Sequence, residues 1–201
     1  MTLDSYREHV KPIIDPVVAV SVRAGLTPNI CTIISLVAAA GSGFAFFRGD
    51  VLIGTLGVIL NAFFDGLDGA LARAMDMQGP KGDFLDHTVD RYADIFIIAG
   101  IFSGPLCPWW IGVLGLTGVL MSSYLGTQAQ AVGVGRMYGG LLGRADRLVL
   151  LIVTGVVVFY FPISVFGLGL FAWLLLIFGF FGHLTAAQRF MHVWKNLKDE
   201  R

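Results

Sequence analysis

Long apolar segments joined by short polar connections constrain this chain more than any other feature of its sequence. Six can be drawn, each close to the ~20 residues that cross a ~30 Å hydrocarbon core as a helix. They cover residues 30–48, 51–74, 83–105, 107–132, 147–161 and 164–188. Only 14% of all residues are charged, against about 25% in an average soluble protein. Since no segment alternates as a barrel strand does, the sequence predicts an all-α integral membrane fold with six transmembrane helices.

The basic residues predict how these helices are oriented. On a six-span drawing, thirteen of the fourteen Lys and Arg residues fall on one side or at the helix ends nearest it, and Arg48 falls on the other. Basic residues concentrate on the cytoplasmic side of membrane proteins. We therefore expect both termini in the cytoplasm and an active site that opens on the cytoplasmic side of the cell membrane.

The N-terminal segment predicts a helix of a different kind. Residues 3–22 place apolar side chains at helical spacing between charged ones, which is typical of an amphipathic helix in the membrane interface. Pro12 and Pro16 are expected to bend or interrupt it. The whole chain is then one domain, with an interfacial N-terminal helix, a six-helix core and a cytoplasmic tail at residues 1–26, 27–190 and 191–201. A net charge of zero gives no basic field for a nucleic acid.

Four aspartates interrupt the second and third segments. Asp65 and Asp68 are three residues apart and Asp86 and Asp90 are four apart, so each pair lies on one face of its helix. Both pairs are expected roughly 5 to 15 Å below the cytoplasmic helix ends. A connection of about eight residues is short enough to make the two helices antiparallel neighbours with facing pairs. Carboxylates at such depth require a cation or another partner.

The ligand chemistry predicts hard divalent cations. His87 is rotated by roughly 100° around the helix from Asp86, so we expect an all-oxygen set, which favours Mg²⁺ or Mn²⁺. With four acidic ligands, two ions about 3.5 to 4 Å apart are favoured, the arrangement that clamps a transferring phosphoryl group. Gly66, Gly69 and Gly82 either leave space for a ligand or serve close helix packing.

The acidic segment resembles a known family. From Asp65 to Asp90 the chain matches every fixed position of the pattern D-x2-D-G-x2-A-R-x8-G-x3-D-x3-D of the CDP-alcohol phosphotransferases. The six-span organisation is also similar, so the resemblance covers nearly the whole chain. It implies a metal-dependent membrane transferase of phospholipid biosynthesis. Such an enzyme moves a phosphatidyl or archaetidyl group from a CDP-linked lipid to the hydroxyl of a small polar acceptor, and CMP is released. The resemblance also implies a homodimer embedded in membrane lipid.

The resemblance assigns roles to individual residues. Asp65, Asp68 and Asp86 would hold two metal ions. Asp90 would contact the second ion and act as the general base on the attacking hydroxyl. Residues that border the cytidine diphosphate in similar members correspond here to Asn29, Thr32, Asp65, Gly69 and Arg73. From its position alone, Asn29 could equally cap the first span. Asp94, one turn beyond Asp90, is expected to support the site or the fold.

The acceptor is predicted from a more specific resemblance. Residues 123–133 and 143–147 are similar to the corresponding region of phosphatidylinositol-phosphate and archaetidylinositol-phosphate synthases, which implies inositol phosphate as the acceptor. The residues expected to bind its phosphate are Arg144, Arg147, Arg189 and Gln128. Gly126 and Gln128 stand where that group has basic residues. Glycerol 3-phosphate or another polyol therefore stays open as the acceptor.

A cation-coupled membrane carrier is the alternative from another functional class, because buried aspartates also bind transported cations. Carriers often contain related halves or broken helices. Residues 100–201 carry no second copy of the acidic pairs, so the sequence favours the transferase.

Overall fold

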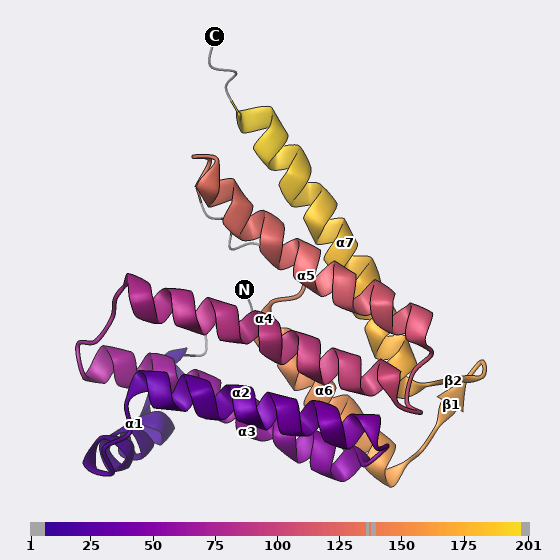
Figure 1. The fold of residues 1–201 in the computed structure, drawn as a ribbon, viewed down its shortest axis with the longest axis horizontal. Helices are drawn as coiled ribbons and strands as arrows, with labels where there is room; N and C mark the ends of the chain where they lie inside the picture. Colours follow the sequence, from indigo (N-terminus) through magenta and orange to yellow (C-terminus); the bar gives the residue numbers. More distant parts are fainter. Residues whose placement is uncertain (1–6, 136, 138–139, 198–201) are drawn as a thin grey trace.

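The computed structural model describes residues 7–135, 137 and 140–197 of the chain (Figure 1). Two sets of sequence-based predictions lie outside the described residues. One is the start of the interfacial segment, residues 1–6. The other comprises the basic residues Arg136, Lys198 and Arg201.

The described residues form seven helices and one short hairpin. The helices are α1 (Arg7–Arg23), α2 (Pro28–Phe47), α3 (Val51–Ala74), α4 (Pro80–Ser103), α5 (Trp109–Ala131), α6 (Arg144–Tyr160) and α7 (Leu170–Asn196). The bounds of α2 to α6 agree with the first five predicted segments within three residues at each end. Thr27 is the N-cap of α2, since its side chain accepts a hydrogen bond from the amide of Ile30.

The predicted start of the last segment is wrong. Residues 164–169 form a hairpin of β1 (Ser164–Val165) and β2 (Leu168–Gly169), and α7 begins only at Leu170 and continues to Asn196. Phe166 and Gly167 both have positive φ, at 51° and 77°, as the two central residues of a hairpin turn require. Apolar composition alone does not distinguish this turn from the first turns of a helix.

Four helices in the described part of the chain, α2, α3, α5 and α7, are long and apolar enough to cross a membrane. They make this an integral membrane protein. Helix α6 has 17 residues, at the lower limit for crossing the hydrocarbon core. Helix α4 carries charged side chains over its first four turns. That all six helices cross the membrane stays a prediction.

Helix α1 is continuous through Pro12 and Pro16, so the expected interruption is wrong. Its last turns pack on the core of the molecule, where Val17 and Val18 lie against a cluster that includes Leu67 and Leu71 of α3. Burial of these apolar side chains offsets the hydrogen bonds that the prolines remove.

The helices pack as two groups (Figure 1). Helix α2 packs against both α3 and α4, and α5 packs along α7, while α6 contacts α3 and α7. Small residues allow this close approach. A Cβ at Gly100 of α4 would lie 2.5 Å from the Cα of Gly43 of α2, and a Cβ at Gly118 of α5 would lie 2.8 Å from the carbonyl of Gly179 of α7.

Helices α3 and α4, expected as direct neighbours, each pack mainly against α2 rather than against each other. Gly57 of α3 fits against Ser42, and the Ser42 hydroxyl donates to the Gly54 carbonyl at 2.7 Å, which holds α3 to α2. Gly100 holds α4 to the same helix, as described above. The two acidic faces therefore meet across a space rather than across a packed helix contact.

Candidate active site

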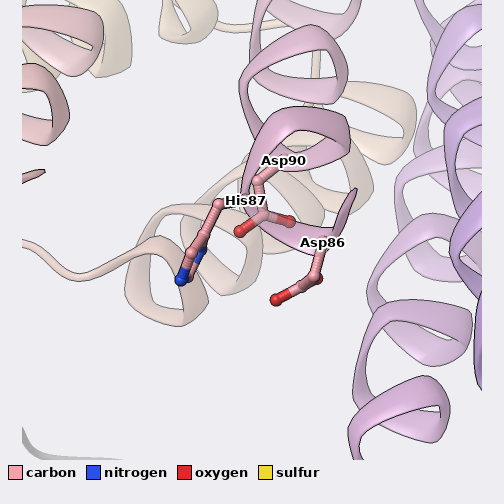
Figure 2. A group of neighbouring side chains, drawn as sticks. All are labelled: Asp86, His87 and Asp90. Carbon is pink, nitrogen blue, oxygen red and sulfur yellow. The ribbon is translucent and has the colours of Figure 1, made fainter. Parts of the chain in front are cut away.

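The four aspartates of the motif do converge. Asp65, Asp68 and Asp86 each place one carboxylate oxygen within 4.8 Å of the others. A second group consists of Asp86, His87 and Asp90, whose ligand atoms satisfy the same limit (Figure 2). Asp86 belongs to both groups, so the structure contains two adjacent sets of possible metal ligands that share one carboxylate.

His87 was not expected at this position. The expectation that no imidazole accompanies the aspartates is wrong, since the His87 imidazole lies beside the carboxylates of Asp86 and Asp90 (Figure 2). The all-oxygen ligand set itself stays a prediction. Its Nε2 also lies 3.1 Å from Asp83 Oδ1, one turn earlier on α4. A nominal angle of about 100° between neighbouring helical residues does not prevent this, because rotation about χ1 and χ2 swings the long imidazole towards the adjacent face.

Asp68 is oriented by the neighbouring helix. It is 6% exposed, and its Oδ2 accepts a hydrogen bond of 2.7 Å from the Thr32 hydroxyl of α2. Thr32 was expected to border the nucleotide. Its contact with a predicted metal ligand gives it a further role, because such hydrogen bonds fix the orientation of ligating carboxylates.

A cavity of about 430 Å³ opens beside Asp68 and Asp86, and its volume suits a small-molecule ligand. Helices α2, α3 and α4 and the connection between the last two line it. The lining residues are Pro28, Asn29, Thr32, Asp68, Gly69, Ala72, Arg73, Met77, Gln78, Gly79, Lys81, Gly82, Asp83 and Asp86. The cavity thus contains four of the five residues predicted to bind the nucleotide.

Lys81 lines the cavity, but the sequence analysis missed this role. It counted Lys81 only among the basic residues expected on the cytoplasmic side of the membrane. Lys81 stands in the first turn of α4 and lines the cavity together with Arg73, at the end of α3. Two cations in the cavity would attract the diphosphate of a nucleotide. A basic residue directly before the fixed Gly82 of the motif was the available signal.

Arg144, expected to bind the phosphate of the acceptor, contacts motif aspartates in the structure, and its role at the acceptor stays a prediction. It begins α6, and its Nη1 lies 2.6 Å from Asp65 Oδ1 and 2.9 Å from Asp90 Oδ1. The guanidinium group therefore sits between two of the four motif aspartates. Asp65, the fifth predicted nucleotide contact, faces this arginine rather than the cavity.

The cluster fits a metal site on its own chemistry. Its carboxylates repel one another at low dielectric, and Arg144 supplies the counter-charge in the structure. Asp90 Oδ1 is buried, yet no group of the described residues donates to it with hydrogen-bond geometry. An acceptor oxygen in this condition, beside further carboxylates and an imidazole, is a suitable ligand for a divalent cation.

The other predicted acceptor residues lie on the far side of Arg144. Arg147 Nη2 bonds to Asp94 Oδ2 at 3.1 Å. Arg189 of α7 donates to the Ser122 carbonyl of α5. A Cβ at Gly126 would lie 2.6 Å from Arg189 Nη1, so the missing side chain at Gly126 makes room for this arginine. Gln128 is half-buried on α5.

Arg91 was also missed by the sequence analysis. It follows Asp90 on α4, and its Nη1 donates to the Ser123 hydroxyl of α5. It also lies 3.5 Å from Asp90 and 3.8 Å from Asp94. No sequence signal separates Arg91 from an ordinary basic residue at a helix end, because its partner on α5 is 32 residues away.

Comparison with known proteins relates this site to a family. The family model of the CDP-alcohol phosphatidyltransferases matches residues 25–187. The archaetidylinositol phosphate synthase of Pyrococcus horikoshii is 32% identical over 151 residues, which cover 75% of this chain and 80% of that protein. The archaetidylinositol phosphate synthase of Methanothermobacter thermautotrophicus is 28% identical over 200 residues, covering 98% and 96%.

Solved structures show the same fold. The Mycobacterium tuberculosis phosphatidylinositol phosphate synthase with CDP-DAG bound matches with a TM-score of 0.77 and 26% identity, covering 91% of this chain and 94% of that chain. The same enzyme in complex with manganese and citrate matches with a TM-score of 0.76 and 27% identity, covering 90% and 88%.

Proposed function

This chain belongs to the CDP-alcohol phosphatidyltransferase family, and from that premise we propose that it transfers the phosphatidyl or archaetidyl group of a CDP-linked lipid to inositol phosphate. The hydroxyl oxygen of the acceptor forms a new bond to the lipid phosphorus. The bond from that phosphorus to the bridging oxygen breaks, and CMP leaves with both electrons of that bond. The observation that carries the proposal is the convergence of the motif carboxylates at the edge of a nucleotide-sized cavity.

Asp65, Asp68, Asp86 and Asp90 are proposed to hold two divalent cations, Mg²⁺ or Mn²⁺. Bound there, the cations would neutralise the diphosphate and stabilise the departing CMP. The two ligand groups that share Asp86 support this number. A relative of this fold has been solved in complex with manganese. Thr32 holds the Asp68 carboxylate in place, and His87 is available as a nitrogen ligand or as a partner of Asp83.

The cavity is proposed to bind the cytidine diphosphate part of the donor. Asn29, Thr32, Gly69 and Arg73 line it, and Lys81 adds a second cation. Gly69 leaves room there, since an added Cβ would lie 3.5 Å from Arg73 Nη1. The lipid tails would then follow the apolar helix surfaces into the membrane.

Asp90 is proposed as the general base. It is 8% exposed and stands between the cavity side of the cluster and the arginines of α6. Its buried Oδ1 is ion-paired with Arg144 Nη1 at 2.9 Å and receives no bond of hydrogen-bond geometry from the described residues. A carboxylate at this position can accept the proton of an incoming hydroxyl. The acceptor must then approach from the side of Arg91, Arg147 and Arg189.

The cationic surroundings of Asp90 support an anionic acceptor. Arg91, Arg147 and Arg189 come from α4, α6 and α7 and converge near residues 122–126 of α5. Guanidinium groups bind phosphate with two parallel hydrogen bonds. Arg91 and Arg189 occupy the region where Gly126 and Gln128 replace expected basic residues, so the lost charge is supplied from other helices. This favours inositol phosphate, while glycerol 3-phosphate remains the competing acceptor in the test below.

The membrane placement is proposed from the same arrangement. Helices α2 to α7 would cross the bilayer with both termini and the acidic cluster on the cytoplasmic side, and α1 would lie in the interface. A homodimer is proposed from the family resemblance.

The decisive experiment measures CMP release by the purified protein in lipid nanodiscs. CDP-diacylglycerol or CDP-archaeol serves as donor, with Mg²⁺ or Mn²⁺ and with inositol phosphate, glycerol 3-phosphate or free inositol as acceptor. We expect CMP only with metal and most rapidly with inositol phosphate. A preference for glycerol 3-phosphate would change the acceptor assignment. Cation flux into vesicles without CMP from any acceptor would replace the transferase by a carrier.

A further inference from the structure

We infer that Asp94 is a positioning residue, which holds Arg91 and Arg147 of the acceptor site and leaves positive charge there for the phosphate of the acceptor. This inference rests on the proposed function. Asp94 lies outside the family motif, one turn beyond Asp90, and it is 6% exposed. A buried carboxylate in a membrane helix requires partners, and the charged partners of Asp94 among the described residues are arginines.

The contacts of Asp94 come from two helices. Its Oδ2 accepts a hydrogen bond of 3.1 Å from Arg147 Nη2 and lies 3.8 Å from Arg91 Nη1. Its Oδ1 lies 3.9 Å from Arg144 Nε. One carboxylate thus faces three guanidinium groups, of which Arg147 is 6% exposed and also donates to the Leu142 carbonyl.

Asp94 differs from Asp65 and Asp90 because no metal ion is proposed to bind it. In the structure, Asp65, Asp90 and Asp94 balance Arg91, Arg144 and Arg147, three charges against three. The proposed function assigns Asp65 and Asp90 to the metal ions. Asp94 is then the one carboxylate of this network that remains with Arg91, Arg144 and Arg147, so positive charge is left over. A phosphate monoester carries about −1.5 to −2 near neutral pH and matches that excess.

The geometry also explains how Asp94 would act without touching the acceptor. A planar guanidinium group that bonds a carboxylate on one edge has its remaining N–H groups fixed in direction. Arg91 lies 3.5 Å from Asp90 and 3.8 Å from Asp94, and it donates to Ser123 on α5, on the face that carries Gly126. Asp94 therefore fixes the side of α4 and α6 that faces α5, where the acceptor phosphate is proposed to bind.

The test compares Asp94→Asn, Asp94→Glu and the wild type by two readouts. The first is the KM of inositol phosphate against the KM of the CDP-lipid. The second, which needs no turnover, is the rise in melting temperature that inositol phosphate produces in the presence of Mg²⁺. Asn keeps the shape of the side chain and removes its charge, whereas Glu keeps the charge. Asp50→Asn, at the opposite helix ends, is the control for removal of one negative charge.

We expect Asp94→Asn to raise the acceptor KM by about tenfold or more and to abolish most of the thermal shift, since partners of this kind are worth about 10- to 100-fold. The donor KM and the affinity for Mn²⁺ should change less than about twofold, and Asp94→Glu should recover part of the loss. An equal rise of both KM values, or full activity of Asp94→Asn, would overturn the inference.

A second variant covers the case in which Asp94→Asn fails to fold. Arg91→Gln removes a more exposed partner of the same carboxylate and should also raise the acceptor KM selectively. An unchanged acceptor KM in Arg91→Gln would contradict the inference. Failure of the proposed function is recognised separately, because wild-type protein would then release no CMP with inositol phosphate and gain no thermal stability from it.

Discussion

The donor side and the acceptor side of this site are built in different ways. On the donor side, every proposed metal ligand lies within the 26 residues from Asp65 to Asp90, on two consecutive helices. On the acceptor side, the cations run from Arg91 to Arg189 and come from three helices. The donor chemistry is thus encoded in one continuous segment, whereas the acceptor site exists only when α4, α5, α6 and α7 are packed together.

This difference suggests how such a scaffold can keep one reaction and change its acceptor. A substitution on α5 or α7 alters the acceptor side without touching the carboxylates. Arg144 is the exception, since it belongs to α6 by sequence but contacts Asp65 and Asp90. Arg144 therefore tests whether the donor side and the acceptor side are separate, and the other residues test each side by itself.

The largest effect is expected at Asp90, where the two sides meet. Asp90→Asn keeps the size of the side chain but removes its ability to accept a proton. We expect kcat to fall roughly a thousandfold, the middle of the range for loss of a general base. Equilibrium binding of the CDP-lipid should be retained. Turnover close to that of the wild type would refute the assignment of Asp90 as the base.

Thr32 tests the donor side alone. Thr32→Val removes the 2.7 Å hydrogen bond to Asp68 while keeping the shape of the side chain. We expect the affinity for Mn²⁺ to fall by about 10- to 100-fold, as for other partners of metal ligands, with the acceptor KM unchanged. Titration of Mn²⁺ by electron paramagnetic resonance measures this.

Ser35→Ala is the matched control for Thr32→Val, because Ser35 is buried on the same helix and donates only to the Thr32 carbonyl among the bonds described. Equal losses of Mn²⁺ affinity in both variants would mean that the effect comes from α2 packing rather than from the carboxylate.

Substitutions of Arg144 and Arg189 test whether the donor side and the acceptor side can be altered separately. Arg189→Ala should raise the acceptor KM about tenfold, the value of one charge-assisted hydrogen bond, and leave Mn²⁺ affinity unchanged. Arg144→Ala should instead strengthen Mn²⁺ binding, because it removes a cation that lies between two proposed ligands. If both variants change only the acceptor KM, Arg144 belongs to the acceptor side after all.

The smallest effect is expected at Gly126. Gly126→Ala places a Cβ 2.6 Å from Arg189 Nη1, so the guanidinium group must shift. The acceptor KM should rise about threefold, since a flexible side chain can recover part of its contact. Gly41→Ala on α2 is the control, because its added Cβ meets no described atom within 4 Å. An equal change in both variants would contradict the role of Gly126.

Much of the fold could be read from the sequence because hydrocarbon permits few structures. Five of the six predicted segments became helices with nearly the predicted bounds. The errors fall where local sequence is ambiguous. The turn at Phe166 and Gly167 is as apolar as the helix that follows it, and Pro12 and Pro16 are accommodated because the end of α1 packs on α3.

The sequence by itself determined the acidic motif, because residues three and four apart must share a helix face whatever surrounds them. It also determined that the chain is a membrane protein. Only the tertiary structure decided that α3 and α4 both pack on α2 and leave a cavity beside Asp68 and Asp86. The same holds for Arg144, which meets carboxylates on two other helices, and for Asp94, which bonds Arg147, 53 residues away. Contacts at such separation depend on how helices pack, and packing follows from small residues whose partners no local pattern reveals.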